Sequence, residues 1–149
     1  MLKAMRRLAA FCLCISLSWG LIAPVSSGAA TTKPKDLTVI KRQAEAFVET
    51  KARLPELARL VSAEDWTFTR NLIHGPMQEV GREMLYINAS LDRAERKEAD
   101  KLARSLKDAL ADLDEAARLQ DADQMQKAYS TLAASFDAYS GVIPAEALS

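Results

Sequence analysis

Cysteine is nearly absent from the sequence, and other residues that often carry chemistry are rare as well. The chain of 149 residues has two cysteines, Cys12 and Cys14, and a single histidine, His74. Without its first 30 residues the chain has no cysteine, which excludes disulfides, thiolate metal sites, thiol catalysis and covalent c-type haem. Glycine and proline number five each, so neither a disordered nor a fibrous protein is expected.

An excess of charge of either sign is also lacking, since 20 basic residues balance 20 acidic ones. Residues 1–30 hold three of the bases and no acid, so the remainder has 17 bases, 20 acids and a formal charge of −3. A mildly acidic domain is a poor candidate for binding nucleic acid. The length and the 49% of apolar residues suit one small globular domain.

The N-terminal segment predicts a cleaved signal peptide over residues 1–30. Three bases precede an apolar stretch at residues 8–25, and small residues follow at 26–30. This order is typical of an export signal that is cleaved after Ala29 or Ala30. A retained membrane anchor is the alternative, since the apolar stretch approaches spanning length.

Pro24 and the small residues after it argue against the anchor. Neither Cys12 nor Cys14 is preceded by the small residues of a lipoprotein cleavage site, so we expect no lipid on either cysteine. We therefore expect a short polar leader at residues 31–35 and a folded domain at residues 36–149.

Apolar residues recur every three or four positions in four blocks of that domain, which predicts four amphipathic helices. Their candidate N-terminal caps are Asp36, Ser62 with Asp65, Asp92 with Glu95, and Asp121 with Gln124. Pro55 should interrupt the first helix, Gly75-Pro76 the second, and Gly141 with Pro144 should end the fourth. Since the connections are short, neighbouring helices should run antiparallel. The sequence predicts an all-α, up-down-up-down four-helix bundle.

The predicted core lies where the apolar stripes meet. We expect Val80, Met84, Leu106, Leu113, Leu132 and Phe136 to face this one core.

No pattern of an enzyme or of a resident cofactor accompanies these helices. A di-metal site would need paired Glu-x-x-His motifs, and His74 has Asn71 three positions before it. A haem site would pair His74 with Met77, Met84 or Met125, but His74 lies off the apolar stripe. We expect no catalytic, cofactor or metal residues, with His74 at most an opportunistic surface ligand of zinc.

The first half of the predicted third helix is rich in bases. They are Arg93, Arg96, Lys97, Lys101, Arg104 and Lys107, interleaved with Glu95, Glu98, Asp100 and Asp108. One interpretation is a solvent face laced with salt bridges. The other is a docking face for an acidic membrane-protein partner, with Arg93, Arg96 and Lys97 as candidate contacts.

A longer motif lies in the predicted second helix. Residues 65–77 read DWTFTRNLIHGPM, and residues 82–85 read REML. This string resembles the second helix of the PsbQ family, and more closely its cyanobacterial branch, CyanoQ. Weaker similarity extends through residues 110–117, Tyr129 and residues 136–139, so the resemblance covers nearly all of the chain after the signal.

The resemblance implies a non-catalytic extrinsic subunit of photosystem II, peripheral on the lumenal side of the thylakoid membrane and monomeric when free. Such subunits stabilise the oxygen-evolving manganese–calcium cluster and its calcium and chloride requirement. They dock on the photosystem II core and on other extrinsic lumenal subunits, which hold those ions. Cyanobacterial members are typically lipoproteins, and Cys12 and Cys14 depart from that pattern. The alternative function is a generic exported helical-bundle adaptor, or a cofactor carrier of the four-helix cytochrome type.

Overall fold

The computed structural model describes residues 36–149, so the predicted signal peptide and leader lie outside the described residues. The elements are α1 (Leu37–Lys51), α2 (Leu54–Ser62), α3 (Trp66–His74), α4 (Val80–Ser90), α5 (Arg93–Leu119), α6 (Ala122–Ser140) and a 3-10 turn, η1 (Ala145–Ala147). No strand occurs between residues 36 and 149, and the prediction of an all-α chain is confirmed there.

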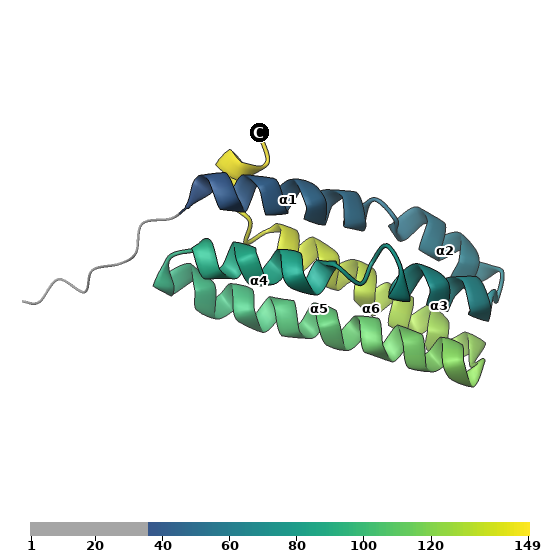
Figure 1. The fold of residues 1–149 in the computed structure, drawn as a ribbon. Helices are drawn as coiled ribbons and strands as arrows, with labels where there is room; N and C mark the ends of the chain where they lie inside the picture. The colour runs from purple at the N-terminus through teal and green to yellow at the C-terminus, as the bar shows by residue number, and fades with distance from the viewer. Residues whose placement is uncertain (1–35) are drawn as a thin grey trace, which may run out of the picture. The chain divides into compact units, whose positions relative to one another are not determined.

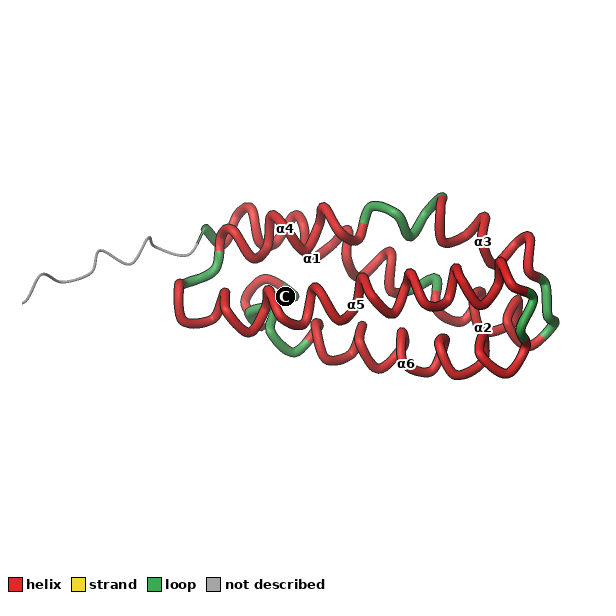
Figure 2. The backbone as a smooth tube through the Cα atoms, turned by 90° about the horizontal axis from the view of Figure 1, so that it is seen from below, coloured by secondary structure: helices red, strands yellow, loops and turns green. Residues whose placement is uncertain are grey.

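The helices lie side by side along a common direction (Figure 1). The chain runs one way through α1 and α2, returns through α3 and α4, runs forward along α5 and returns along α6. The closest packing joins α5 to α6 and α1 to α4, while α3 and α4 both pack on α5. Figure 2 shows the loop that separates α3 from α4, whereas α5 and α6 continue without a break.

Three aspartates begin helices by accepting a hydrogen bond from a backbone amide in the first turn. Asp36 accepts from Val39 N at 3.2 Å, Asp65 from Phe68 N at 3.1 Å and Asp121 from Gln124 N at 2.9 Å. These side chains satisfy amides that lack a partner within the helix.

Two predicted caps differ from the structure. Ser62 is the last residue of α2 rather than a cap of α3, because Glu64, with φ 52°, turns the chain and leaves Asp65 at the cap position. Asp92 lies at the cap position of α5, but its side chain makes no capping hydrogen bond.

Both predicted interruptions occur, although the first lies elsewhere than at the proline. The chain leaves the helix at Ala52 and Arg53, and Pro55 lies in the first turn of α2, where proline is tolerated. α3 ends at His74, and the amide of the next residue, Gly75, donates to Asn71 O at 2.9 Å. A Cβ on Gly75 would lie 2.8 Å from that carbonyl oxygen, so the close approach requires glycine.

The apolar sides of the helices enclose one core. All six residues expected there are buried, and the phenyl ring of Phe47 packs against the rings of Phe136 at 5.5 Å and Tyr139 at 5.0 Å between centroids. Leu37 and Val48 of α1 share the apolar spacing of three or four residues with the buried side chains of this helix, but they are 45% and 48% exposed. The apolar spacing therefore locates the core correctly, but it overestimates how much of α1 is buried in that core.

Candidate docking surface

α5 carries most of the charged residues that the sequence singles out, and its two halves have opposite charge. Residues 93–107 contain six bases and three acids, while residues 108–119 contain four acids and one base. Both halves bury the same kind of apolar stripe, including Leu106 in the first half and Leu113 in the second. The helix therefore presents two different surfaces over a continuous core.

Four bases in the first half extend into solvent. Arg93, Lys97, Arg104 and Lys107 are exposed, and none forms a hydrogen bond or ion pair with another of residues 36–149. Lys101 does pair with Glu98, at 3.6 Å between Nζ and Oε1. Of the six bases in the first half, Lys101 alone forms a salt bridge with another of residues 36–149, so the interpretation as a face laced with salt bridges holds for that base. We call Arg93, Lys97, Arg104 and Lys107 the basic face.

Arg96, the third predicted docking residue, faces back into the protein. Its Nε donates to Asn88 O at 2.7 Å, and one terminal nitrogen donates to Ala89 O at 2.5 Å and to Leu91 O at 3.4 Å. These carbonyls lie at the end of α4, where a positive charge is favourable, and of the three, Asn88 O also accepts from Leu91 N at 3.3 Å. Arg96 therefore fastens the α4–α5 connection, and only Arg93 and Lys97 of the predicted trio lie on the basic face.

A buried polar chain fixes how α4 lies against α5 and α6. The Asn88 amide donates to Asp100 at 2.8 Å, and the Tyr139 hydroxyl donates to the Asn88 side-chain oxygen at 2.6 Å. The same hydroxyl lies 3.2 Å from Met84 O. Burial, and then the charge of Asp100, raise the pKa of Tyr139, so the phenol stays protonated and can donate.

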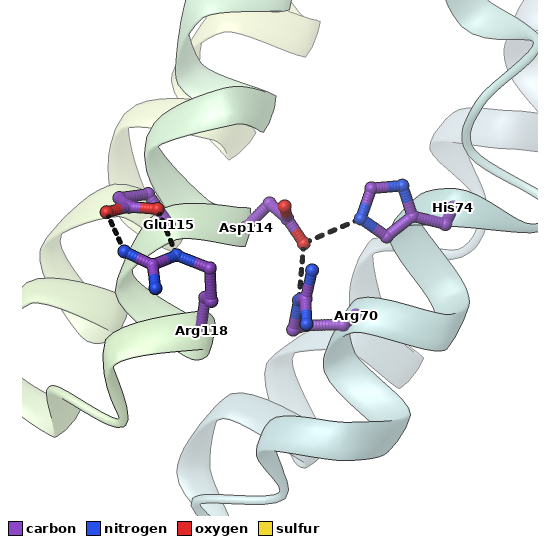
Figure 3. Close-up of polar contacts among 5 residues, drawn as sticks. All are labelled: Arg70, His74, Asp114, Glu115 and Arg118. Atoms are coloured by element: carbon purple, nitrogen blue, oxygen red, sulfur yellow. Dashed lines mark hydrogen bonds and ion pairs between the residues drawn. The ribbon is translucent and has the colours of Figure 1, made fainter.

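Two acids in the second half of α5 are paired with cations of the same chain (Figure 3). One oxygen of Asp114 accepts from Arg70 Nε at 2.9 Å and meets His74 Nε2 at 2.8 Å, which ties α3 to α5. Burial acts to raise the pKa of Asp114, but the hydrogen bonds from Arg70 and His74 outweigh it and lower the pKa. Glu115 is held by Arg118 one turn later, with N–O distances of 2.6 and 2.7 Å.

His74 lies at the protein surface, where it pairs with Asp114. Its side chain is 58% exposed, whereas Met77, Met84 and Met125 are fully buried, so the haem ligands considered above are not brought together. Within residues 36–149, no group of three or more His, Cys, Asp or Glu side chains is arranged to hold a metal ion. Nor does any helix between residues 36 and 149 combine the length and apolar character needed to cross a bilayer.

The sequence profile described as "PsbQ: Oxygen evolving enhancer protein 3" matches residues 23–144, most of the chain. This chain belongs to the PsbQ family. Among the relatives of this PsbQ-family chain is CyanoQ of Synechocystis sp., which is 31% identical over 88 residues. That alignment covers 59% of this chain and 59% of CyanoQ. The resemblance to the family and to its cyanobacterial branch is confirmed.

One buried titratable group of this PsbQ-family chain carries no signal in the sequence. The carboxyl of Glu83 on α4 is 6% exposed and accepts from the Thr50 hydroxyl of α1, at 3.3 Å to either oxygen. Burial raises the pKa of Glu83, the Thr50 hydrogen bond lowers it less, and the charge of Glu79 raises it further. A buried carboxyl without a cationic partner favours its neutral form.

Proposed function

We propose that this chain is a non-catalytic extrinsic subunit of photosystem II on the lumenal side of the thylakoid membrane. The observation that carries the proposal is the PsbQ match across residues 23–144, strengthened by the similarity to CyanoQ. The partners we propose are the photosystem II core and other extrinsic lumenal subunits, to which the free monomer docks.

The finer architecture we propose is an up-down-up-down four-helix bundle in which α1 with α2 and α3 with α4 each form one interrupted rod. The path of the chain and the packing of α1 on α4 and α5 on α6 support this description. Short connections between antiparallel neighbours are the rule in such bundles.

The proposed contribution to water oxidation is indirect. A subunit that binds no cofactor of its own acts on the manganese–calcium cluster by stabilising neighbouring subunits and by restricting the exchange of solvent and ions. We propose that it thereby lowers the concentrations of calcium and chloride that oxygen evolution requires, while other subunits hold these ions.

Arg93 and Lys97 are the residues of the predicted trio that we retain as contacts with an anionic partner. They are exposed and unpaired among residues 36–149. Arg96 is left in place in any test, because its hydrogen bonds to Asn88 O and Ala89 O support the fold.

A deletion strain tests the proposal. We expect near-normal oxygen evolution when calcium and chloride are ample, and a clear deficit when either ion is depleted. Restoring the gene should remove the deficit, and a C-terminal tag on the restored protein should recover photosystem II subunits. Oxygen evolution equal to the parent under both limitations, together with failure to recover photosystem II, would refute the proposal.

A further inference from the structure

The basic face forms a straight line of positive charge. Arg93, Lys97, Arg104 and Lys107 follow one another at intervals of three, four or seven residues along a single continuous helix. At 1.5 Å per residue, the line from Arg93 to Lys107 is about 21 Å long. Because these side chains have no acidic partner among residues 36–149, their charge is available to an external surface.

Exposed apolar side chains on α4 lie at the same level along the helix axis as this line. The hydrogen bond from Asn88 to Asp100 places these two residues at the same level of the antiparallel pair α4 and α5. Leu85, three positions before Asn88, therefore lies at the level of residues 103–104, within the length of α5 that the basic face covers. Leu85 is 64% exposed and the adjacent Tyr86 is 48% exposed.

We propose that the basic face, with Leu85 and Tyr86 at its edge, binds the anionic headgroups of a lipid bilayer directly. This contact goes beyond the proposed function, in which proteins alone hold the chain at the membrane. Basic side chains attract an anionic leaflet, and a leucine and a tyrosine beside them can enter the boundary between headgroups and acyl chains.

A planar anionic partner fits this surface better than an acidic protein pocket does. All four bases lie along one convex helix, so a flat surface can meet them together, whereas a pocket would have to enclose them. The charge distribution along α5 also sets the orientation of the bound protein relative to the bilayer. The surface of α5 turns acidic at Asp108, and both Asp108 and Asp112 are exposed there, so an anionic bilayer attracts the first half of α5 and repels the second.

The experiment uses the chain purified in the form in which its host accumulates it. Binding is measured by co-sedimentation with vesicles of phosphatidylglycerol and phosphatidylcholine in equal amounts, and with vesicles of phosphatidylcholine alone. The test variant replaces the basic face (R93Q/K97Q/R104Q/K107Q). A control of equal charge replaces four exposed bases elsewhere (R42Q/R53Q/R59Q/K127Q).

We expect binding to the anionic vesicles, little binding to the neutral ones, and loss of binding at about 1 M salt, where charges are screened beyond about 3 Å. Each base near an anionic surface contributes about fivefold, so the test variant should bind several-hundred-fold more weakly. The control should retain most of the binding. Leu85→Ser should weaken binding further than Leu119→Ser, a change at a comparably exposed leucine of the second half.

Three outcomes would overturn the inference: no binding to anionic vesicles at low salt, equal binding to neutral vesicles, or equal losses in the test variant and the control. Each vesicle measurement is made without photosystem II, so it is independent of the proposed function. If the test variant fails to recover photosystem II while the parent chain does not bind vesicles, the basic face has an acidic protein partner instead of lipid.

Discussion

The two halves of α5 place charged side chains over the same core, nine in the first half and five in the second, yet they employ them differently. In the second half, Asp114 and Glu115 are bound by Arg70, His74 and Arg118. In the first half, the four bases of the basic face have no partner among residues 36–149. Charge that is engaged inside the protein supports the fold, whereas charge that is left without a partner is available for binding.

The difference originates in the neighbouring helices. α3 brings a guanidinium and an imidazole to Asp114, because Arg70 and His74 lie one turn apart on the side of α3 that faces α5. α4 instead offers carbonyls at its C-terminal end, and one arginine, Arg96, satisfies them. The remaining bases of the first half are not required by the fold.

The largest losses of stability should come from substitutions in the core, and they should be similar in the two halves of α5. Leu106→Ala and Leu113→Ala each remove a fully buried side chain, so each should lower the free energy of unfolding by about 2–5 kcal/mol. Chemical denaturation followed by circular dichroism measures both. If only one of the two substitutions lowered the free energy of unfolding, the core would not be continuous. The two halves of α5 would then differ in their packing as well as in their surface charge.

The next effect concerns the acid that ties α3 to α5. Asp114→Asn should lower the free energy of unfolding by about 1–2 kcal/mol, an amount limited by the solvent exposure of Arg70 and His74. Since the pKa of Asp114 is lowered in the folded protein, its contribution is present above the ordinary aspartate pKa and is lost as the pH falls through the lowered value. The parent and the variant should therefore converge in stability at strongly acidic pH, as followed by denaturation at several pH values.

A smaller effect separates two adjacent bases of the first half. Arg96→Ala removes the donor to Ala89 O and one of the two donors to Asn88 O, which also accepts from Leu91 N, and should cost about 1 kcal/mol. Lys97→Ala removes an exposed side chain and should change the free energy of unfolding by less than about 0.5 kcal/mol. Thermal denaturation of the two variants side by side measures the difference, and equal losses would show that Lys97 also supports the fold.

The smallest effect comes from the Glu83 carboxyl on α4, which, unlike Asp114, forms no ion pair with another of residues 36–149. Glu83→Gln should raise the free energy of unfolding at pH 7 by less than about 1 kcal/mol, because the amide needs no proton to remain neutral and still accepts from Thr50. The pKa of Glu83 is raised in the folded protein, so its stabilising contribution is present at low pH and is lost as the pH rises through the raised value. The gain should vanish below the ordinary glutamate pKa. A loss of stability at pH 7 would show that the ionised carboxylate is the form the fold requires.

Local signals in the sequence were sufficient for the helices and for most of the core. The caps at Asp36, Asp65 and Asp121 act within a few residues along the chain, so their signal is complete in the sequence. Ser62 fails as a cap because Asp65, three residues later, competes for the same role, and the left-handed turn at Glu64 decides between them.

Contacts between helices could not be predicted in the same way. Asp114 meets Arg70 and His74, which lie 44 and 40 residues earlier in the chain. Apolar spacing indicates which side of a helix faces the core, but it does not fix how far one helix slides along another. The role of Arg96 depends on the geometry of the turn between α4 and α5, and the burial of Glu83 depends on the level at which α1 meets α4.

The interruptions at residues 52–53 and 75–79 divide the packing of the shorter helices into two groups. α1 packs on α4, and α2 packs on α3, while α5 and α6 continue past both interruptions. Amide hydrogens of α2 and α3 can therefore exchange with solvent through a local opening that leaves α1 and α4 protected. Because α5 and α6 are continuous, they keep α1 and α4 in their folded positions while α2 and α3 open.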